Sequence, residues 1–317
     1  MELKSLTYVV FALAVAVLYY GAGAVKYGQR IVLLAANLVF IVATSGMKSL
    51  AIITLCVAIS FFAGLRIEKA VLANQKSRAR RLFWLDVIVS LAILCYFKFF
   101  KDTFVLLQDF LAGRGIAVSE LVSPIGLSYF TLTMIAYAND IYHKKHPAER
   151  NFLNYFVFIT YFPSIVQGPI NLYKTTAPQF KLRHQPSAEK ITKGLQRSLW
   201  GYIKKVVIAD RIGILVMAIL KDEAAGGFLL FWAMVLYSFQ IYADFSGGID
   251  VIMGLSEMLD IRLAENFRSP LVSRSVTEYW QRWHMSLGEF MEKYLYYPIV
   301  LNRSVMKFSK RISNKYL

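Results

Sequence analysis

Cysteine, histidine and charged residues are all scarce in this 317-residue chain, and each scarcity argues against a class of protein. The two cysteines, Cys56 and Cys95, lie inside apolar runs, so neither is expected to form a disulfide, ligate a metal or act as a nucleophile. The four histidines form no Cys/His cluster, so no metal site is expected. The sequence has no Walker-type phosphate loop, which argues against an ATP-driven pump.

Charged residues make up 18% of the chain and hydrophobic residues 57%, whereas typical soluble domains have about 25% and 45–50%. The apolar residues occur in long uncharged runs such as Leu6–Val25, Ile31–Met47 and Leu50–Leu65. A helix needs about 17–25 apolar residues to cross a bilayer. The composition therefore predicts an all-α, polytopic membrane protein and argues against a soluble enzyme, a disordered chain and a secreted disulfide scaffold.

Seven segments are predicted to cross the membrane. They are Leu6–Val25, Ile31–Met47, Leu50–Leu65, Leu82–Phe100, Val118–Tyr142, Leu199–Leu220 and Phe228–Ala243. The first resembles a signal peptide, but the preceding residues carry Glu2 beside Lys4, so a retained helix is expected.

The net charge of +16 has two readings. In a soluble protein it would suggest nucleic-acid binding. In a membrane protein such a charge reflects the excess of Lys and Arg in cytoplasmic loops. We favour this second interpretation and therefore expect no nucleic-acid partner. A basic loop at residues 66–81 is expected to be cytoplasmic, which places the N-terminus outside.

Some apolar stretches are not expected to cross. Phe152–Tyr173 is broken by Pro163, Gly168 and Pro169 and precedes the basic segment Lys174–Lys205, so we expect a re-entrant hairpin with both ends on the cytoplasmic side. The stretch Ile249–Leu259 and the aromatic stretch at residues 294–298 are predicted to be interfacial or re-entrant helices.

The densest group of polar residues lies between Gln240 and Glu289. Ionisable groups near membrane depth are costly and are therefore functional candidates. The residues singled out are Gln240, Asp244, Ser246, Asn266, Trp280, Arg282, Trp283 and His284. A simpler interpretation stands beside this one: Asp244 and Asp250 pair with arginines at 262, 268 or 282, and the tryptophans form an interfacial belt.

His284 is the sharpest candidate, because Trp283 and Met285 flank it and desolvation keeps a buried imidazole neutral. A neutral imidazole can accept a proton from an attacking hydroxyl. A lone histidine of this kind is more often a satisfied buried side chain. The remaining histidines, His143, His146 and His184, lie in basic loops and are expected to be solvated.

Four motifs together resemble the membrane-bound O-acyltransferase (MBOAT) family. They are Pro124-Ile-Gly-Leu-Ser-Tyr-Phe130 with Tyr137-Ala-Asn-Asp-Ile-Tyr142, Tyr161-Phe-Pro-Ser-Ile-Val-Gln-Gly-Pro-Ile170, Gln240-Ile-Tyr-Ala-Asp-Phe-Ser-Gly-Gly248, and Glu265-Asn-Phe267 with Trp280-Gln-Arg-Trp-His-Met-Ser-Leu287. Their order and spacing are most similar to the bacterial branch that acetylates alginate and D-alanylates teichoic acids. Residues 1–110 match only in hydropathy.

The resemblance implies a ring of tilted transmembrane helices with re-entrant helices around a central funnel. It also implies that the histidine of a Trp-His-x-Ser-Leu motif, here His284, is essential. The family carries a second histidine in a Trp-His-Gly motif, which this chain lacks, and residues 299–303 depart from the family's Gly-Gly-Asn-Arg. We therefore expect one integral membrane domain over residues 1–317, with N-terminal helices at 1–110 and the MBOAT-like core at 118–317, truncated at its C-terminus.

The expected reaction is transfer of an acyl group, foremost acetyl, from a cytoplasmic thioester to hydroxyls of an extracytoplasmic polysaccharide. His284 would deprotonate the hydroxyl, and Gln240, Ser246 and Asn266 would orient substrate or stabilise the oxyanion. Asp244 would orient the donor or a nearby basic group. Trp280, Arg282 and Trp283 complete the expected binding residues.

No bound cofactor is expected, only a co-substrate: the phosphopantetheine of an acyl carrier protein, or acetyl-CoA. The expected partners are the lipid bilayer, an acyl carrier protein on the basic cytoplasmic face, and an extracytoplasmic transferase. Anionic lipid accounts equally well for the basic residues of that face. The expected location is the bacterial cytoplasmic (inner) membrane.

Three alternatives to acetyl transfer stay open. The first is D-alanyl transfer to teichoic acid. The second is a transporter whose broken helices surround a site at the membrane midplane. The third is a non-catalytic scaffold that recruits extracellular transferases.

Overall fold

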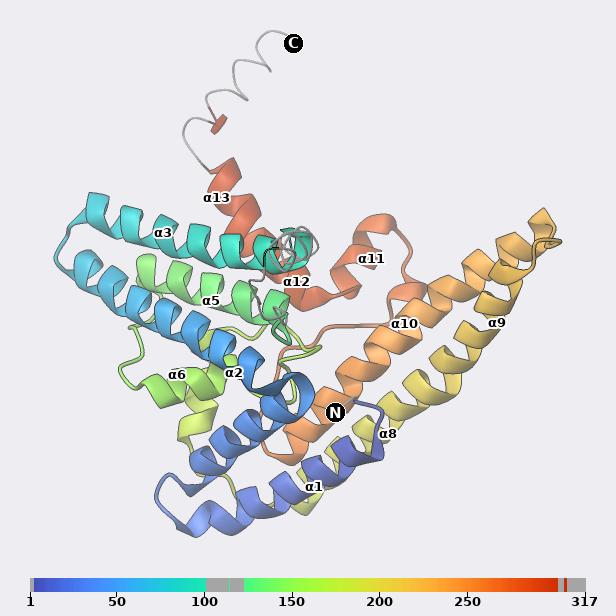
Figure 1. Cartoon of the computed structure of the whole chain (residues 1–317), viewed down its shortest axis with the longest axis horizontal. Coiled ribbons are helices and arrows are strands. Elements are labelled where there is room, and N and C mark those ends of the chain that lie inside the picture. Colours follow the sequence, from blue (N-terminus) through green and yellow to red (C-terminus); the bar gives the residue numbers. More distant parts are fainter. Residues whose placement is uncertain (1–2, 101–113, 115–122, 302–304, 307–317) are drawn as a thin grey trace, which may run out of the picture. The chain divides into compact units, whose positions relative to one another are not determined.

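The computed structural model describes residues 3–100, 114, 123–301 and 305–306 (Figure 1). The chain divides into two compact units: unit 1 comprises Met1–Gly168 and Leu172–Leu263, and unit 2 comprises Pro169–Asn171 and Ala264–Leu317. Within the described residues all regular secondary structure is helical, which confirms the predicted all-α class. The expected division between residues 110 and 118 lies outside the described residues, apart from residue 114.

Unit 1 begins with two long apolar helices. In α1 (Leu6–Gly21) the Ser5 Oγ accepts a hydrogen bond from the Tyr8 N–H at 3.2 Å and so caps the helix. The helix α2 (Gly28–Leu72) is interrupted only at Gly46, where φ is 77° and ψ is 174°. Glycine tolerates this conformation without a side-chain clash, so the helix bends there. The predicted crossings at 31–47 and 50–65 are therefore two arms of one kinked helix.

The prediction that residues 66–81 form a loop is wrong, whereas their cytoplasmic location stays a prediction. Helix α2 continues to Leu72, residues 73–75 form the turn, and α3 (Lys76–Cys95) starts immediately afterwards. Arg and Lys are good helix formers, and their long side chains carry the charge into water from a helix end, so a basic stretch needs no loop.

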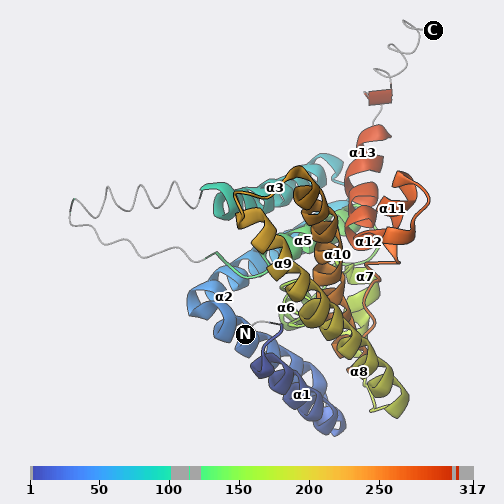
Figure 2. The same cartoon turned by 90° about the vertical axis from the view of Figure 1, so that its right-hand side faces the viewer.

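A third layer packs on α2 and α3. Helix α5 (Leu127–Tyr142) contacts both, and Figure 2 shows it beside α3, which continues into the π-helical segment η2 (Tyr96–Phe100). A Cβ at Gly64 of α2 would lie 2.9 Å from the Tyr137 ring, so the missing side chain admits that ring. The helix is shorter than the predicted crossing at 118–142, whose first five residues lie outside the described ones.

The segment after α5 is a short buried helix followed by irregular backbone. Helix α6 (Phe152–Ile159) has only eight residues, and Tyr161 and Phe162 beyond it are at most 1% exposed. Asn37 of α2 satisfies this backbone: its Oδ1 accepts from the Phe162 N–H at 2.9 Å, and its Nδ2 donates to Thr160 Oγ1 at 3.1 Å. The predicted break in this apolar stretch is confirmed, whereas its re-entrant path stays a prediction.

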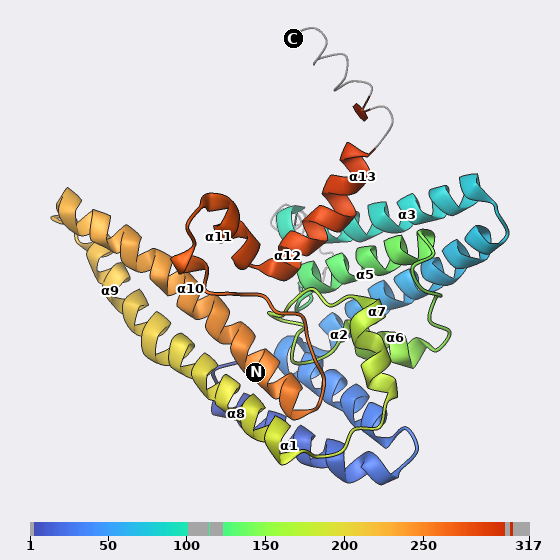
Figure 3. The ribbon, with the colours of Figure 1, turned by 180° about the vertical axis from the view of Figure 1, so that it is seen from behind.

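The rest of unit 1 is built around an antiparallel pair of long helical stretches (Figure 3). After the short α7 (Tyr173–Thr176) and η3 (Ala177–Lys181), the first stretch combines α8 (Ala188–Tyr202), the π-helical η4 (Ile203–Ala209) and α9 (Asp210–Lys221). The second is α10 (Gly227–Met258). Their backbones approach closely, since a Cβ at Gly254 would lie 2.3 Å from the Gly194 carbonyl oxygen and a Cβ at Gly201 would lie 2.6 Å from the Gly247 oxygen.

Four helical stretches of the described residues are long and apolar enough to span a membrane: Leu6–Ala24, Gly28–Leu72, Lys76–Phe100 and Gly227–Met258. This is an integral membrane protein. The expected interfacial helix at 249–259 is wrong, because it is the end of α10. Gly247 and Gly254 do not break this helix, because they lie at the contact with the α8–α9 stretch. The predicted crossing at 199–220 is divided among α8, η4 and α9 and is not among the four. The expected ring around a funnel stays a prediction.

The contact between α8 and α10 gives a direct test of this packing. We expect Gly254→Ala to lower the free energy of unfolding by about 1–3 kcal/mol, the usual cost of overpacking, because the added Cβ would lie 2.3 Å from both the Gly194 oxygen and Ser198 Oγ. Gly226→Ala is the matched control, since nothing lies within 4 Å of its added Cβ. Thermal unfolding in detergent measures both. Equal melting temperatures for the two variants would contradict the packing.

Candidate active site

Unit 2 contains two short helices that meet at a sharp corner. Helix α11 (Val276–Arg282) is capped by Ser275, whose Oγ accepts from the Glu278 N–H at 3.1 Å. Helix α12 (Met285–Phe290) follows almost at once, and His284 between them has φ 47° and ψ 52°. A non-glycine residue in this left-handed region is uncommon, and such strain clusters at functional sites. The 3₁₀ turn η5 (Pro270–Val272) precedes these helices, and η6 (Met291–Tyr296) and α13 (Tyr297–Val300) follow them.

Two backbone hydrogen bonds hold the segment 266–268 against this corner. The Met285 N–H donates to the Asn266 carbonyl oxygen at 2.9 Å, and the Arg268 N–H donates to the Arg282 carbonyl oxygen at 3.0 Å. As a result, the Asn266 side chain, which is fully buried, lies next to the imidazole of His284.

The Asn266 side chain determines which nitrogen of His284 carries the proton. Asn266 Oδ1 contacts the Ser286 backbone N at 3.1 Å, and because this N–H can only donate, the Asn266 atom is the acceptor. The same Oδ1 lies 3.1 Å from His284 Nδ1. His284 Nδ1 must therefore donate its hydrogen to Asn266, and the lone pair of the neutral imidazole lies on Nε2.

Ser286 strengthens this arrangement. Its Oγ accepts a hydrogen bond from the Ile170 N–H at 3.0 Å, and it lies 2.8 Å from Asn266 Oδ1. Since Asn266 Oδ1 only accepts, the Ser286 hydroxyl donates to it. Three donors thus converge on one oxygen that is shielded from water, which holds the amide, the serine and the imidazole in one geometry.

Burial lowers the pKa of His284 below its ordinary value, because desolvation disfavours the imidazolium. The imidazole is therefore neutral at neutral pH and suited to accept a proton at Nε2. The Asn266 Nδ2 is buried and has no hydrogen-bond partner within the described part of the chain. An amide N–H of this kind is the donor type that stabilises an oxyanion.

The other predicted residues of unit 2 surround this network. Trp283 stacks on Tyr279, with ring centroids 5.6 Å apart, and meets the edge of Phe267 at 5.1 Å. Arg282 Nη2 forms an ion pair with Glu278 Oε1 at 2.5 Å. Trp280 is 63% exposed.

Trp280 lines a groove of about 690 Å³ in unit 2. The other lining residues are Ala264, Glu265, Val276, Thr277, Gln281, Met285, Gly288, Glu289 and Glu292. Two of these residues, Glu265 and Met285, are sequence neighbours of Asn266 and His284, so the groove runs beside the network.

The three remaining predicted residues lie on α10 in unit 1, where they contact the α8–α9 stretch. Lys205 Nζ lies 2.6 Å from Asp244 Oδ1, and Lys204 Nζ donates to Ser246 Oγ at 3.1 Å. Gln240 packs against Gly213. These contacts place the three side chains between the two helical stretches, and their role in orienting substrate stays a prediction.

The expected pairing of the aspartates with arginines at 262, 268 or 282 is wrong. Asp244 pairs with Lys205, whereas Asp250 pairs with Lys204 and with Arg197, whose Nε lies 3.0 Å from Asp250 Oδ1. The antiparallel packing brings the basic residues of the first stretch against α10, and residues this far apart in sequence give no local signal of it.

The prediction that His184 is solvated is also wrong. It is 7% exposed, its Nδ1 lies 3.1 Å from Asp260 Oδ2, and its Nε2 lies 2.8 Å from the Gln179 carbonyl oxygen. His143 is exposed, as expected, whereas His146 is partly buried and packs on the rings of Tyr137 and Tyr173, so the prediction that it is solvated is wrong. Ser286 was not selected as a site residue, although its position two residues after His284 was available as a signal. Among the described residues no three His, Cys, Asp or Glu side chains are grouped to hold a metal ion.

The fold and this site define an integral membrane protein in which buried Asn266 and Ser286 hold the partly buried His284 in one hydrogen-bond network. Residues 81–313 match the model of the MBOAT, membrane-bound O-acyltransferase, family. The match covers well over half of the chain, so the chain belongs to this family.

Individual relatives agree with this assignment. The chain is 34% identical over 249 residues to the probable alginate O-acetylase AlgI of Azotobacter vinelandii, covering 77% of this chain and 49% of that protein. It is 30% identical over 292 residues to the peptidoglycan O-acetyltransferase of Helicobacter pylori (83% and 54%), and 28% identical over 201 residues to the teichoic acid D-alanyltransferase of Bacillus subtilis (60% and 49%). The chain spans about half the length of the relatives it matches.

Proposed function

We propose that this protein is a membrane O-acyltransferase in which His284 is the general base. The observation that carries the proposal is the hydrogen-bond network of Asn266 and Ser286, which leaves the His284 lone pair on Nε2. In a chain of the MBOAT family, such a nitrogen is suited to take the proton of an acceptor hydroxyl.

The reaction balances without a covalent enzyme intermediate. The hydroxyl oxygen attacks the thioester carbonyl carbon while its proton passes to His284 Nε2, which gives a tetrahedral oxyanion. When the carbon–sulfur bond breaks, an ester forms and the imidazolium returns the proton to the leaving thiolate. The Asn266 Nδ2 N–H is a candidate donor to the oxyanion.

Acetyl is the proposed acyl group and an extracytoplasmic polysaccharide the proposed acceptor. The relatives at 30–34% identity are an alginate O-acetylase and a peptidoglycan O-acetyltransferase, whereas the D-alanyltransferase is 28% identical over a shorter stretch. The inner membrane, an outside N-terminus and an extracytoplasmic transferase partner remain part of the proposal.

The donor is proposed to be acetyl-CoA or an acetylated carrier protein. Most cations of the basic segment Lys174–Lys205 form ion pairs with carboxylates of this chain. Fewer unpaired positive charges are therefore left to bind an acidic carrier protein than the composition suggests. The pairs are Lys181–Glu149, Lys190–Asp260, Lys193–Glu189, Arg197–Asp250, Lys204–Asp250 and Lys205–Asp244.

A transfer assay tests the function. Membrane vesicles that contain the protein receive acetyl-labelled CoA or acetyl-labelled carrier protein together with de-O-acetylated polysaccharide. We expect polymer-bound label that mild base releases, as esters require, and none from vesicles without the protein. Transfer from a D-alanyl thioester alone would favour the alternative acyl group, and no transfer from any donor would contradict the proposal.

A further inference from the structure

The turn between α1 and α2 lies at a membrane surface. Both flanking helices are long and apolar enough to span a bilayer, and only residues 25–27 separate the helical turn η1 (Ala22–Ala24) from α2. Two successive spans must meet at the same side of the membrane, so this turn is at the depth of the lipid headgroups.

The turn presents two cations on one aromatic ring. Lys26 Nζ lies 5.1 Å and the Arg30 guanidinium carbon 4.6 Å from the centroid of the Tyr27 ring. Within the described residues neither cation has a carboxylate partner within 4 Å. Two like charges held on one ring raise the local positive potential, which an anion would relieve.

The backbone adds to this positive potential. Tyr27 has φ 65°, and no side chain caps the α2 N-terminus that follows it. The Gly28 N–H already donates to the Val25 carbonyl oxygen at 2.9 Å, and the N–H groups that follow it at the start of this long helix favour an anion. The turn is tight, since a Cβ at Gly28 would lie 2.3 Å from the Ala22 carbonyl oxygen.

A distant segment supplies the opposite wall. Gln29 clamps the backbone of His184: its Nε2 donates to the His184 carbonyl oxygen at 2.7 Å, and its Oε1 accepts from the His184 N–H at 2.9 Å. This clamp fixes Lys181 and Arg183 beside the turn, where they line a cavity of about 370 Å³ with Lys26 and Arg30. Lys181 is neutralised by Glu149, whereas Arg183 has no carboxylate partner in the described part of the chain.

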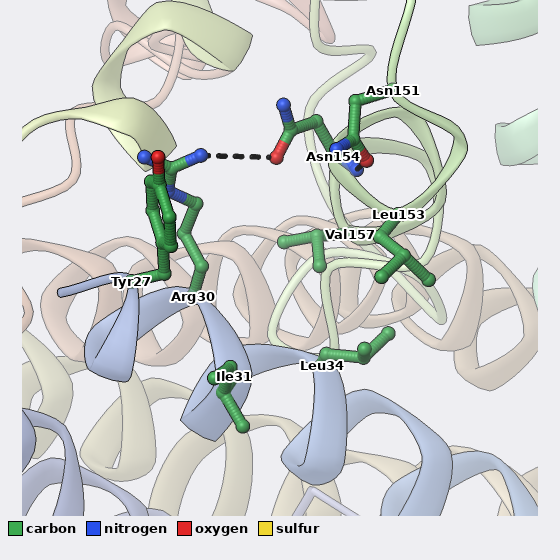
Figure 4. Close-up of a pocket in the computed structure, with 8 residues that line it drawn as sticks. All are labelled: Tyr27, Arg30, Ile31, Leu34, Asn151, Leu153, Asn154 and Val157. Atoms are coloured by element: carbon green, nitrogen blue, oxygen red, sulfur yellow. Dashed lines mark hydrogen bonds between the residues drawn. The ribbon is translucent and has the colours of Figure 1, made fainter.

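An apolar groove opens from the same cations. A second cavity, of about 460 Å³, shares Tyr27 and Arg30 with the first (Figure 4). Its polar end is made by Arg30, Asn151 and Asn154, with Arg30 Nη1 donating to Asn154 Oδ1 at 3.3 Å. The remaining lining residues are Ile31, Leu34, Leu153 and Val157.

We propose that these two cavities form one binding site for an anionic phospholipid. The phosphate would lie against Lys26, Arg30, Arg183 and the start of α2, and an acyl chain would follow the apolar side chains of α2 and α6. Charge and depth favour a lipid: a cationic end without counterions meets an apolar groove on a membrane-spanning helix. The proposal does not depend on the proposed acyl transfer.

Lipid binding to the purified protein tests this proposal. Native mass spectrometry from detergent measures retention of phosphatidylglycerol and of phosphatidylcholine, which has no net charge. We expect the wild type to prefer phosphatidylglycerol, and the double variant Lys26→Ala/Arg30→Ala to bind it at least tenfold more weakly. The matched control is Arg80→Ala/Arg81→Ala, which removes two exposed cations at the start of α3 and should bind like the wild type.

Two further measurements test the apolar groove and distinguish a lipid from a free phosphate. Leu153→Trp changes an exposed position and leaves the charges in place, and it should weaken phosphatidylglycerol binding by filling the groove. Soluble glycerol phosphate at the lipid's concentration should not displace the lipid. Equal binding by the Lys26/Arg30 variant and the control, unaltered binding by Leu153→Trp, or full displacement by glycerol phosphate would each overturn the proposal. The Leu153 variant decides the matter if the double variant does not fold.

Discussion

Replacing His284 with alanine is expected to reduce acyl transfer by about 10²–10⁴-fold, the usual contribution of a general base. The imidazole is the only group of its network that can accept a proton near neutral pH, since Asn266 and Ser286 do not titrate in that range. The measurement is base-labile label transferred per unit of protein in membrane vesicles, with the amount of protein determined by immunoblot.

His143→Ala is the matched control, because this exposed histidine lies outside the network. It should transfer label at the wild-type rate. A His284→Ala protein that is present in normal amount and fully active would end the assignment of His284 as base.

The pH profile of the wild type adds a second readout. Burial lowers the pKa of His284, so the neutral form persists to pH values below the ordinary histidine range. Activity should therefore be constant around neutrality and fall only as the pH drops below about 6.5. A loss of activity that begins well above neutral pH would indicate a different titrating group.

Removing the acceptor on Asn266 is expected to have the second largest effect. In Asn266→Leu no oxygen accepts from His284 Nδ1, so the imidazole is free to rotate or to change tautomer. A wrong tautomer in a Ser-His-Asp triad costs about 10⁴-fold, so we expect a loss of about 10²–10⁴-fold in transfer. The same vesicle assay measures this variant.

Asn266→Asp separates positioning from mere structural support. The carboxylate keeps an acceptor for Nδ1 and also places a negative charge beside the imidazole, which raises the histidine pKa. Because the carboxylate lacks the Nδ2 donor to the oxyanion, we expect this variant to recover only part of the activity lost in Asn266→Leu, and to move the acidic limb of the pH profile to higher pH. Recovery without a shift of that limb would indicate that Asn266 supports the fold but does not set the state of His284.

Much of the fold could be predicted because long apolar runs leave few alternatives. The run in α1 matches its prediction closely, and the break after α6 follows from Pro163 and Gly168. Helix ends were less predictable. At Gly46 the helix α2 bends, and no neighbouring atom lies within 4 Å of an added Cβ there. At Gly247 and Gly254 the helix α10 stays straight, because these glycines contact the backbone of the neighbouring stretch. The effect of a glycine on a helix therefore depends on the neighbouring helices.

The candidate site was predicted in part. His284 and Asn266 were both singled out, but 18 residues separate them and no periodicity brings them together. Their contact depends on the left-handed corner at His284 and on the backbone bond from Met285 to Asn266. The same corner brings Ser286 Oγ to 2.8 Å from Asn266 Oδ1.

By itself the sequence determined that this is an all-helical membrane protein and which residue types are available for chemistry, because apolar run length and composition act locally. Only the tertiary structure decided which polar side chains meet. Asp244 and Ser246 contact lysines across the interface between α10 and the α8–α9 stretch. The backbone corner at His284 brings Asn266 and Ser286 into one hydrogen-bond network with the imidazole. Hydrogen bonds and ion pairs act over about 3–4 Å, so they depend on contacts that separation along the chain does not reveal.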